Sequence, residues 1–212
     1  MGGKQAMSSL AEPLCTAEEY LTLERAADRR SELVNGRIYA MAGAGRAHGL
    51  IIGNLMRHLG NQLLERPCEM HTGEMRVKVS ETGTYVYPDV VVACGEPDFE
   101  DGHLDTLTNP TLVVEVLSPS TEGYDRSAKF AHYRRVPSLR QYVLIAQSEP
   151  RVECYTRQED GELWLFSEVT DLSATVHLAS IECDLPLTEA YRRVTFPPPD
   201  EEPQARSPRR RR

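Results

Sequence analysis

The stretch that decides the fold of this chain is Thr111-Leu112-Val113-Val114-Glu115-Val116-Leu117, followed by Ser118-Pro119-Ser120-Thr121. Its nearly continuous apolar run predicts a strand buried on both faces, as in the centre of a parallel sheet. Residues 124–135 then predict a helix that ends before Pro137, and residues 141–146 predict another strand. A strand, a helix and a second strand in this order predict a right-handed βαβ unit.

The region before this unit predicts two helices and a hairpin. Thr16-Ala17-Glu18-Glu19 matches a capping box, which predicts a helix through Ala26. Asn35-Gly36 lies between two apolar stretches and predicts a tight hairpin turn. Apolar residues recur every four positions from residue 46 to 64, which predicts an amphipathic helix.

Further strands are predicted at residues 75–79 and 85–94, and a trailing hairpin at residues 151–156 and 163–169. The long acidic loop at 95–110 is expected to be functional or mobile, and its carboxylates either add metal ligands or are solvated. The element order predicts an α/β or α+β domain, a mixed sheet covered by helices.

Length and charge constrain the organisation of the chain. Its 212 residues fit one domain, expected at residues 16–195, between a flexible segment at 1–15 and a disordered Pro/Arg-rich tail at 196–212. The net charge is −8, and the tail contributes about +2, so the body is acidic. Tight non-specific DNA binding needs basic surface, so this acidity argues against it without excluding a local basic groove.

Neither export nor membrane insertion is predicted. The first residues lack the apolar core of a signal peptide, and no apolar run is long enough to span a membrane. The five cysteines are widely spaced without a C-x-x-C pair, so we expect reduced thiols in a cytoplasmic protein and no zinc site. They are Cys15, Cys68, Cys94, Cys154 and Cys183.

Two carboxylates interrupt the apolar strands. Asp89 follows Pro88, and Glu115 is the one charge in its strand. Burial of an unpaired charge is costly, so something must compensate each carboxylate. They either share a divalent cation such as Mg²⁺ or bond to separate partners, and the pattern alone leaves both readings open.

Lys129 also has two readings. Asp125 and Lys129 are spaced i, i+4, which suits an ion pair on a helix surface. Alternatively, the helix brings the ammonium beside Asp89 and Glu115, where it orients a water or stabilises negative charge. His48 is expected to be structural, Tyr133 either core or a residue that orients Lys129, and Ser118 a turn residue with no recognisable base.

Several motifs in order resemble the Uma-two family of restriction endonucleases, in the PD-(D/E)XK nuclease superfamily. They are Glu32-Leu33-Val34-Asn35-Gly36, Tyr87-Pro88-Asp89-Val90, Val114 to Thr121, and then Asp125, Lys129 and Tyr133. The similarity runs from about Thr16 to about Val194. It implies a restriction-endonuclease-like mixed sheet with an αβββαβ core flanked by helices.

The resemblance also implies site residues. Asp89 and Glu115 match the motif carboxylates, and with the Val116 backbone carbonyl they are expected to hold Mg²⁺, or alternatively Mn²⁺. Leu117 occupies the usual lysine position, so Lys129 is expected to supply the ammonium. Glu32 matches an acidic residue that reaches the metal through water. Asp125 either contacts metal or holds Lys129 in place, and any role for Gln141 is doubtful.

These expectations favour a metal-dependent endonuclease acting on DNA, with Asp89, Glu115, Lys129 and Glu32 as catalytic residues. A non-catalytic module that binds protein or nucleic acid is the alternative, favoured by the acidic body. A hydrolase of small phosphorylated substrates is a third reading. A homodimer would suit a double-strand cut, although no residue identifies an interface.

Overall fold

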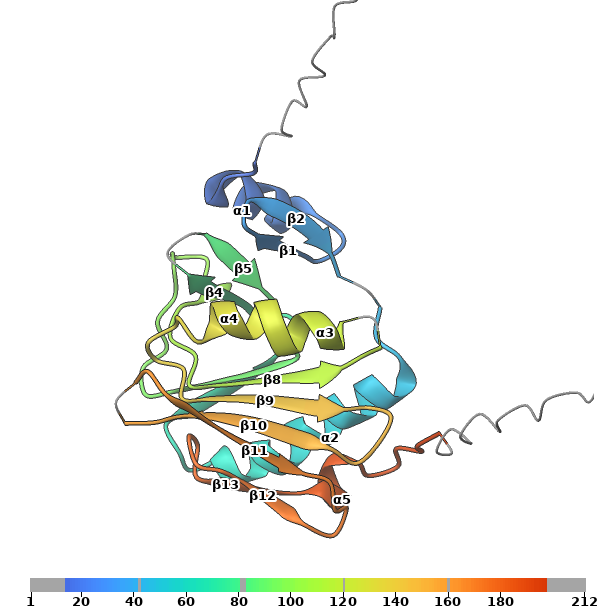
Figure 1. Ribbon diagram of the computed structural model, residues 1–212. Coiled ribbons are helices and arrows are strands. Elements are labelled where there is room, and N and C mark those ends of the chain that lie inside the picture. The colour runs from blue at the N-terminus through green and yellow to red at the C-terminus, as the bar shows by residue number, and fades with distance from the viewer. Residues whose placement is uncertain (1–13, 42, 81–82, 120, 160, 198–212) are drawn as a thin grey trace, which may run out of the picture.

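The computed structural model describes residues 14–41, 43–80, 83–119, 121–159 and 161–197, which form two main sheets with helices around them (Figure 1). The flexible segment expected at 1–15 and the tail expected at 196–212 fall almost entirely outside the described residues. The domain boundaries therefore stay predictions.

A six-stranded mixed sheet contains the predicted βαβ unit. Its order is β11-β10-β9-β8-β6-β3. These strands are β3 (Cys68–Thr72), β6 (Val90–Cys94), β8 (Leu112–Leu117), β9 (Gln141–Ala146), β10 (Val152–Arg157) and β11 (Trp164–Val169). Strand β8 pairs in parallel with β9 and antiparallel with β6, so the βαβ unit, the trailing hairpin and the mixed α+β class are confirmed.

The helical connection between β8 and β9 differs from a regular helix. It consists of α3 (Glu122–Tyr124), a π-helical turn η1 (Asp125–Lys129) and α4 (Phe130–Tyr133). Wide turns of this kind are rare and occur frequently at functional sites. Here the wide turn leaves both Asp125 and Lys129 buried.

A five-stranded sheet with the order β2-β1-β5-β4-β7 forms the second layer, and α1 (Ala17–Ala26) packs on it. Its strands are β1 (Ser31–Val34), β2 (Arg37–Ala40), β4 (Arg76–Ser80), β5 (Thr84–Val86) and β7 (Thr106–Leu107). The predicted capping box is confirmed at Thr16 and Glu19. The hairpin turn is confirmed at Asn35 and Gly36, both with positive φ.

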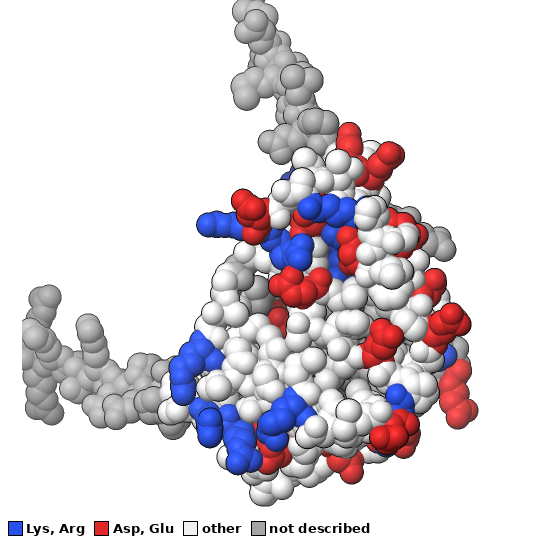
Figure 2. Space-filling view, turned by 180° about the vertical axis from the view of Figure 1, so that it is seen from behind, with Lys and Arg blue, Asp and Glu red and all other residues white. Residues whose placement is uncertain are grey.

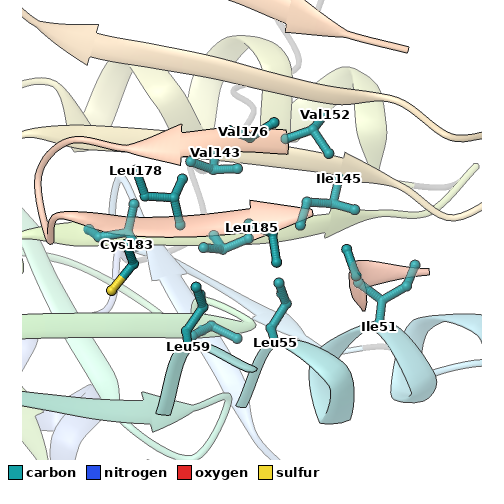
Figure 3. Packing of buried hydrophobic residues seen from close by; sticks show 14 of the residues in the cluster. Ile51, Leu55, Leu59, Val143, Ile145, Val152, Val176, Leu178, Cys183 and Leu185 are labelled. Carbon is teal, nitrogen blue, oxygen red and sulfur yellow. The ribbon is translucent and has the colours of Figure 1, made fainter. Parts of the chain in front are cut away.

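Helix α2 (Arg46–Leu63) covers one face of the six-stranded sheet, beside a small hairpin and a short helix (Figures 1 and 3). These additional elements are β12 (Thr175–Leu178), β13 (Cys183–Pro186) and α5 (Leu187–Ala190). Ile51, Leu55 and Leu59 have no exposed surface, and each such side chain stabilises the fold by about 1.5–3 kcal/mol.

The opposite face of the same sheet turns toward α4 and the smaller sheet. Val113 and Leu117 pack there with Tyr133, whereas Val114 and Val116 pack toward α2. Because side chains alternate along a strand, Glu115 lies on the same face as Val113 and Leu117. The sheet thus directs this carboxylate toward the helical connection that carries Lys129.

The single strand predicted at 85–94 is wrong. The segment contains β5 in one sheet and β6 in the other, and residues 87–89 leave the regular strand between them. Proline has no N–H to donate to a ladder, so Pro88 is a natural break. Asp89 therefore lies at the crossing between the two sheets.

The expectation of five reduced thiols is also wrong, because Cys68 and Cys94 form a disulfide. The register of β3 and β6 places these two residues directly opposite each other. The sequence gave no sign of this pairing, because the segment that forms β3 is short and polar and was not predicted as a strand. A cytoplasmic location loses the support of reduced thiols, because disulfides are uncommon in the cytosol.

The 95–110 loop is solvated in part, since Glu96 and Asp98 are exposed, whereas its other carboxylates have partners. Arg25 donates hydrogen bonds to Asp101 and Asp105, and Lys78 and Tyr85 donate to Glu100. The loop also contributes β7, which pairs with β4. Ion pairs therefore fix it against α1 and the smaller sheet.

Asp105→Asn is expected to destabilise the protein by about 1–2 kcal/mol at pH 7, a value reduced for the partial exposure of this side chain. Hydrogen bonds from Arg25 hold the pKa of Asp105 well below its ordinary 3.8, and the buried Arg76 adds to this. Stability from a lowered pKa is present above the ordinary value and is lost as pH falls through the folded value. Urea denaturation from pH 7 to pH 2 should show the difference shrinking in acid, while Glu96→Gln, an exposed change in the same loop, should show none.

Candidate functional site

Lys129 lies at the centre of a buried group of carboxylates. Its Nζ is 2.8 Å from Glu115 Oε1, 3.2 Å from Glu32 Oε1 and 3.8 Å from Asp125 Oδ1. Three elements supply these side chains, namely β8, β1 and the π-helical turn η1. Lys129 therefore forms the expected ion pair with Asp125 and also brings its ammonium to Glu115.

Asp89 approaches the group from the other side of β8. The β6–β8 register pairs Val90 with Val114, so continuing it places Asp89 opposite Glu115. Asp89 Oδ2 accepts a hydrogen bond from the Val116 N–H at 2.7 Å. The crossing between the sheets and the edge of β8 thus hold this carboxylate near Glu115.

The charges of this cluster are unbalanced, with four carboxylates around one ammonium. Burial raises the pKa of Glu115 well above its ordinary value, Lys129 opposes the rise, and Asp89 and Asp125 add to it. Burial likewise raises the pKa of Asp125. Such mutual repulsion is relieved when a cation binds.

Lys129 remains protonated in this setting. Burial disfavours its charge, but Glu115, Glu32 and Asp125 together raise its pKa well above the ordinary value. Tyr133 donates a hydrogen bond to Glu115 Oε1 at 3.2 Å, and Glu32 Oε1 accepts one from the Tyr87 N–H. Tyr133 therefore both belongs to the core and orients a site carboxylate.

Asp89, His48 and Glu32 are more exposed than the other side chains of the site. Their side chains are 18, 15 and 12% exposed, against 4% for Glu115 and 7% for Lys129. The exposed groups form the rim, and Glu115 and Lys129 form the floor.

The donor set of the site is small for a metal centre. Among the described residues, no group of three or more His, Cys, Asp or Glu side chains could hold a metal ion. Asp89 and Glu115 supply two carboxylates, and Mg²⁺ typically takes one or two while keeping several waters. Binding of Mg²⁺ or Mn²⁺ at Asp89 and Glu115, with the Val116 carbonyl as a further ligand, therefore stays a prediction.

His48 is a site residue that the sequence reasoning missed. It lies in the first turn of α2, and its Nε2 is 3.2 Å from Asp89 Oδ2. Its position three residues before Ile51 placed it on the inward face of the helix, which was the available signal. Nothing in the sequence paired that face with Asp89.

Two other residues considered from the sequence have structural roles. Gln141 accepts hydrogen bonds from the backbone and side chain of Ser180 and donates one to Thr156. Ser118 Oγ lies 2.9 Å from Thr121 Oγ1, in the turn after β8.

The surface outside the site is not uniformly acidic. Seen from behind, Lys and Arg side chains lie in the upper part of the molecule, mixed with acidic groups, and in a second group at the lower left (Figure 2). In the region of α2 and α5, Arg57, Arg192 and Arg193 line an open hollow of about 390 Å³. Glu189 pairs with Arg57 and Arg192 at 2.6 and 3.2 Å. A local basic surface therefore exists on the acidic body.

Comparison with known proteins identifies the family. Residues 17–188 match the Uma2 model, described as "Putative restriction endonuclease". The chain belongs to the Uma2 family. This agrees with the resemblance seen in the motifs, and it makes a nuclease the coarse functional assignment.

Two relatives come from Synechocystis sp. and are both described as uncharacterized. One, sll1609, is 39% identical over 166 residues, covering 78% of this chain and 93% of its own. The other, slr1290, is 34% identical over 184 residues, covering 87% and 95%.

A solved structure shows the same fold. A crystal structure from Anabaena variabilis, described as a putative nuclease belonging to DUF820, matches with a TM-score of 0.69 and 18% identity. The match covers 83% of this chain and 97% of that chain. In the described part of the present chain, no helix is long and apolar enough to cross a membrane.

Proposed function

We propose that this protein is a Mg²⁺-dependent endonuclease that hydrolyses phosphodiester bonds of DNA. The observation that carries the proposal is the buried cluster in which Asp89 and Glu115 face each other beside Lys129. A non-catalytic module has no need for so many buried carboxylates around a single cation, because burial without a partner is costly.

Asp89 and Glu115, with the Val116 carbonyl, would hold Mg²⁺, and Mn²⁺ is the alternative. A metal bound there supplies polarisation of the phosphate and a lower pKa for a bound water. Lys129 would orient the attacking water or stabilise the negative charge that develops on the phosphate. Glu32 and Asp125 hold its ammonium in place, and Tyr133 fixes Glu115.

DNA is the proposed substrate because of the family, and RNA and small phosphodiesters are the alternatives. The Arg57, Arg192 and Arg193 surface offers phosphate contacts outside the site, since guanidinium groups match phosphate geometry. A cytoplasmic location and a homodimer are part of the proposal, and neither follows from the residues described above.

The function is tested by nicking of supercoiled plasmid DNA with Mg²⁺ or Mn²⁺ and with a chelator, alongside metal titration calorimetry. We expect metal-dependent nicking and metal binding that Asp89→Asn removes. Metal binding without cleavage of DNA, RNA or small phosphodiesters would favour a non-catalytic module. Absence of both would contradict the proposed function.

His48→Ala is expected to lower Mg²⁺ affinity by about 10–100-fold, the usual cost of losing a partner that orients a metal ligand. The imidazole Nε2 contacts Asp89 Oδ2, so its loss removes one of two contacts that orient this oxygen, the other being the Val116 N–H. Calorimetric titration measures the change. His58→Ala is the matched control, because His58 lies on the same helix and contacts the Asp184 carbonyl instead. Equal affinities in wild type and His48→Ala would show that Asp89 needs no such support.

A further inference from the structure

Tyr124 differs from the other tyrosines around the site. Its hydroxyl oxygen is buried and has no hydrogen-bond partner among the described residues. By contrast, the hydroxyl of Tyr133 donates to Glu115, that of Tyr142 to the Asp125 carbonyl, and that of Tyr87 to Glu24. Only Tyr124, in this group, keeps a buried polar atom unsatisfied.

The hydroxyl of Tyr124 lies beside the charged cluster. Tyr124 is the last residue of α3 and directly precedes the wide turn that carries Asp125 and Lys129. Its ring packs against the core on the Glu115 face of the sheet. Burial raises its pKa well above the ordinary value, the charge of Glu32 adds to the rise, and Lys129 opposes it. The phenol therefore stays protonated and can act as a donor.

An unpartnered buried donor has no structural advantage. Leaving it unsatisfied costs free energy, and phenylalanine would fill the same space without that cost. Unsatisfied groups in functional sites commonly await a ligand.

We propose that the Tyr124 hydroxyl is a substrate-binding group that donates a hydrogen bond to an anionic non-bridging oxygen of the phosphodiester. This inference rests on the proposed nuclease function. An anionic oxygen of the substrate would supply the acceptor that the described residues do not provide. Placed beside Lys129, such a donor stabilises charge that grows on the phosphate as the attacking oxygen bonds to phosphorus.

Tyr124→Phe tests the proposal through stability and activity together. We expect a melting temperature equal to or above that of wild type, because a buried unsatisfied group is removed. We expect kcat for nicking to fall by about 100-fold, the lower range for removing one transition-state donor. Mg²⁺ affinity measured by calorimetry should stay unchanged.

Tyr191→Phe is the matched control. Its hydroxyl donates to the Arg151 carbonyl and accepts from the Arg151 N–H, and its ring packs on the α2 face of the sheet, away from Lys129. Loss of these bonds should lower the melting temperature by about 2–4 °C. Its nicking rate should equal that of wild type below the transition.

The outcomes separate the two proposals. Unchanged kcat in Tyr124→Phe, with wild-type nicking still dependent on Asp89, would overturn the role of Tyr124 and leave the nuclease function standing. A melting temperature lowered as in Tyr191→Phe, without the loss of kcat, would show a structural hydroxyl. If wild type neither cleaves nor binds a DNA duplex in fluorescence anisotropy with Ca²⁺, the nuclease function fails and this inference fails with it.

Discussion

Glu115→Gln is expected to lower the rate of Mg²⁺-dependent plasmid nicking by about 1,000-fold or more. Glu115 lies on the floor of the site and contacts the Lys129 ammonium. Continuing the register of the neighbouring strands β6 and β8 places it opposite Asp89. Metal-assisted stabilisation of the transition state contributes several kcal/mol, and each 1.4 kcal/mol corresponds to about a tenfold rate. Glutamine keeps the shape of the side chain but loses the charge that would hold a cation.

The matched control is Glu153→Gln. Glu153 is also a buried strand carboxylate, at 5% exposure, and it pairs with Arg126 outside the cluster. This change should reduce stability but leave the nicking rate of folded protein unchanged. Rates are compared at equal folded fractions, measured by circular dichroism. Nicking by Glu115→Gln at the wild-type rate, with contaminating nuclease removed, would refute the assignment of the site.

Glu115, Asp89 and Lys129 could be singled out from the sequence because their signals are local. Glu115 is the one charge in an apolar strand, and Asp89 follows a proline that ends a strand. The helix after β8 had to return along the sheet to begin β9, so it carried Lys129 over the face that holds Glu115. Periodicity and the rule of right-handed connection singled out these three positions, and the family resemblance was needed to assign them roles as metal ligands and catalytic lysine.

The contacts of His48 and Glu32 were not predictable because they join segments that are distant in the sequence. His48 reaches Asp89 only when α2 crosses the edge of the sheet, and the sequence does not specify that crossing. Glu32 was placed by resemblance, and its direct contact with Lys129 depends on how the two sheets pack. Tyr124 gave no signal, since an aromatic residue on a helix is usually core, and its unpartnered hydroxyl is visible only in three dimensions.

The elements of the fold divide in the same way, into those with local sequence signals and those that depend on contacts between distant segments. Elements with strong periodicity or turn chemistry, such as α2 and the Asn35-Gly36 hairpin, were confirmed close to their expected ends. Strand β3 was missed because Cys68-Glu69-Met70-His71-Thr72 is polar and lies at a sheet edge. The Cys68–Cys94 disulfide was missed with it, since only the pairing of β3 with β6 brings the two residues together.

Lys129→Met is expected to destabilise the protein by about 3–5 kcal/mol, the usual cost of removing one partner from a buried ion pair. Methionine fills the volume of the aliphatic chain but leaves Glu115, Glu32 and Asp125 without a cation. Urea denaturation at pH 7 measures the loss. Lys78→Met is the control, because the Lys78–Glu100 pair is partly exposed and should contribute no more than about 1 kcal/mol.

The double variant Glu115→Gln/Lys129→Met tests whether repulsion among the carboxylates causes the loss of stability in Lys129→Met. Removing one carboxylate should recover part of the lost stability, giving a coupling energy of about 1–3 kcal/mol between the two sites. Mg²⁺ should raise the melting temperature of Lys129→Met more than that of wild type, because a cation now has to balance the whole cluster. Additive losses in the double variant, together with no effect of Mg²⁺ on either protein, would show that the carboxylates of the free protein are protonated and that Lys129 does not hold the cluster together.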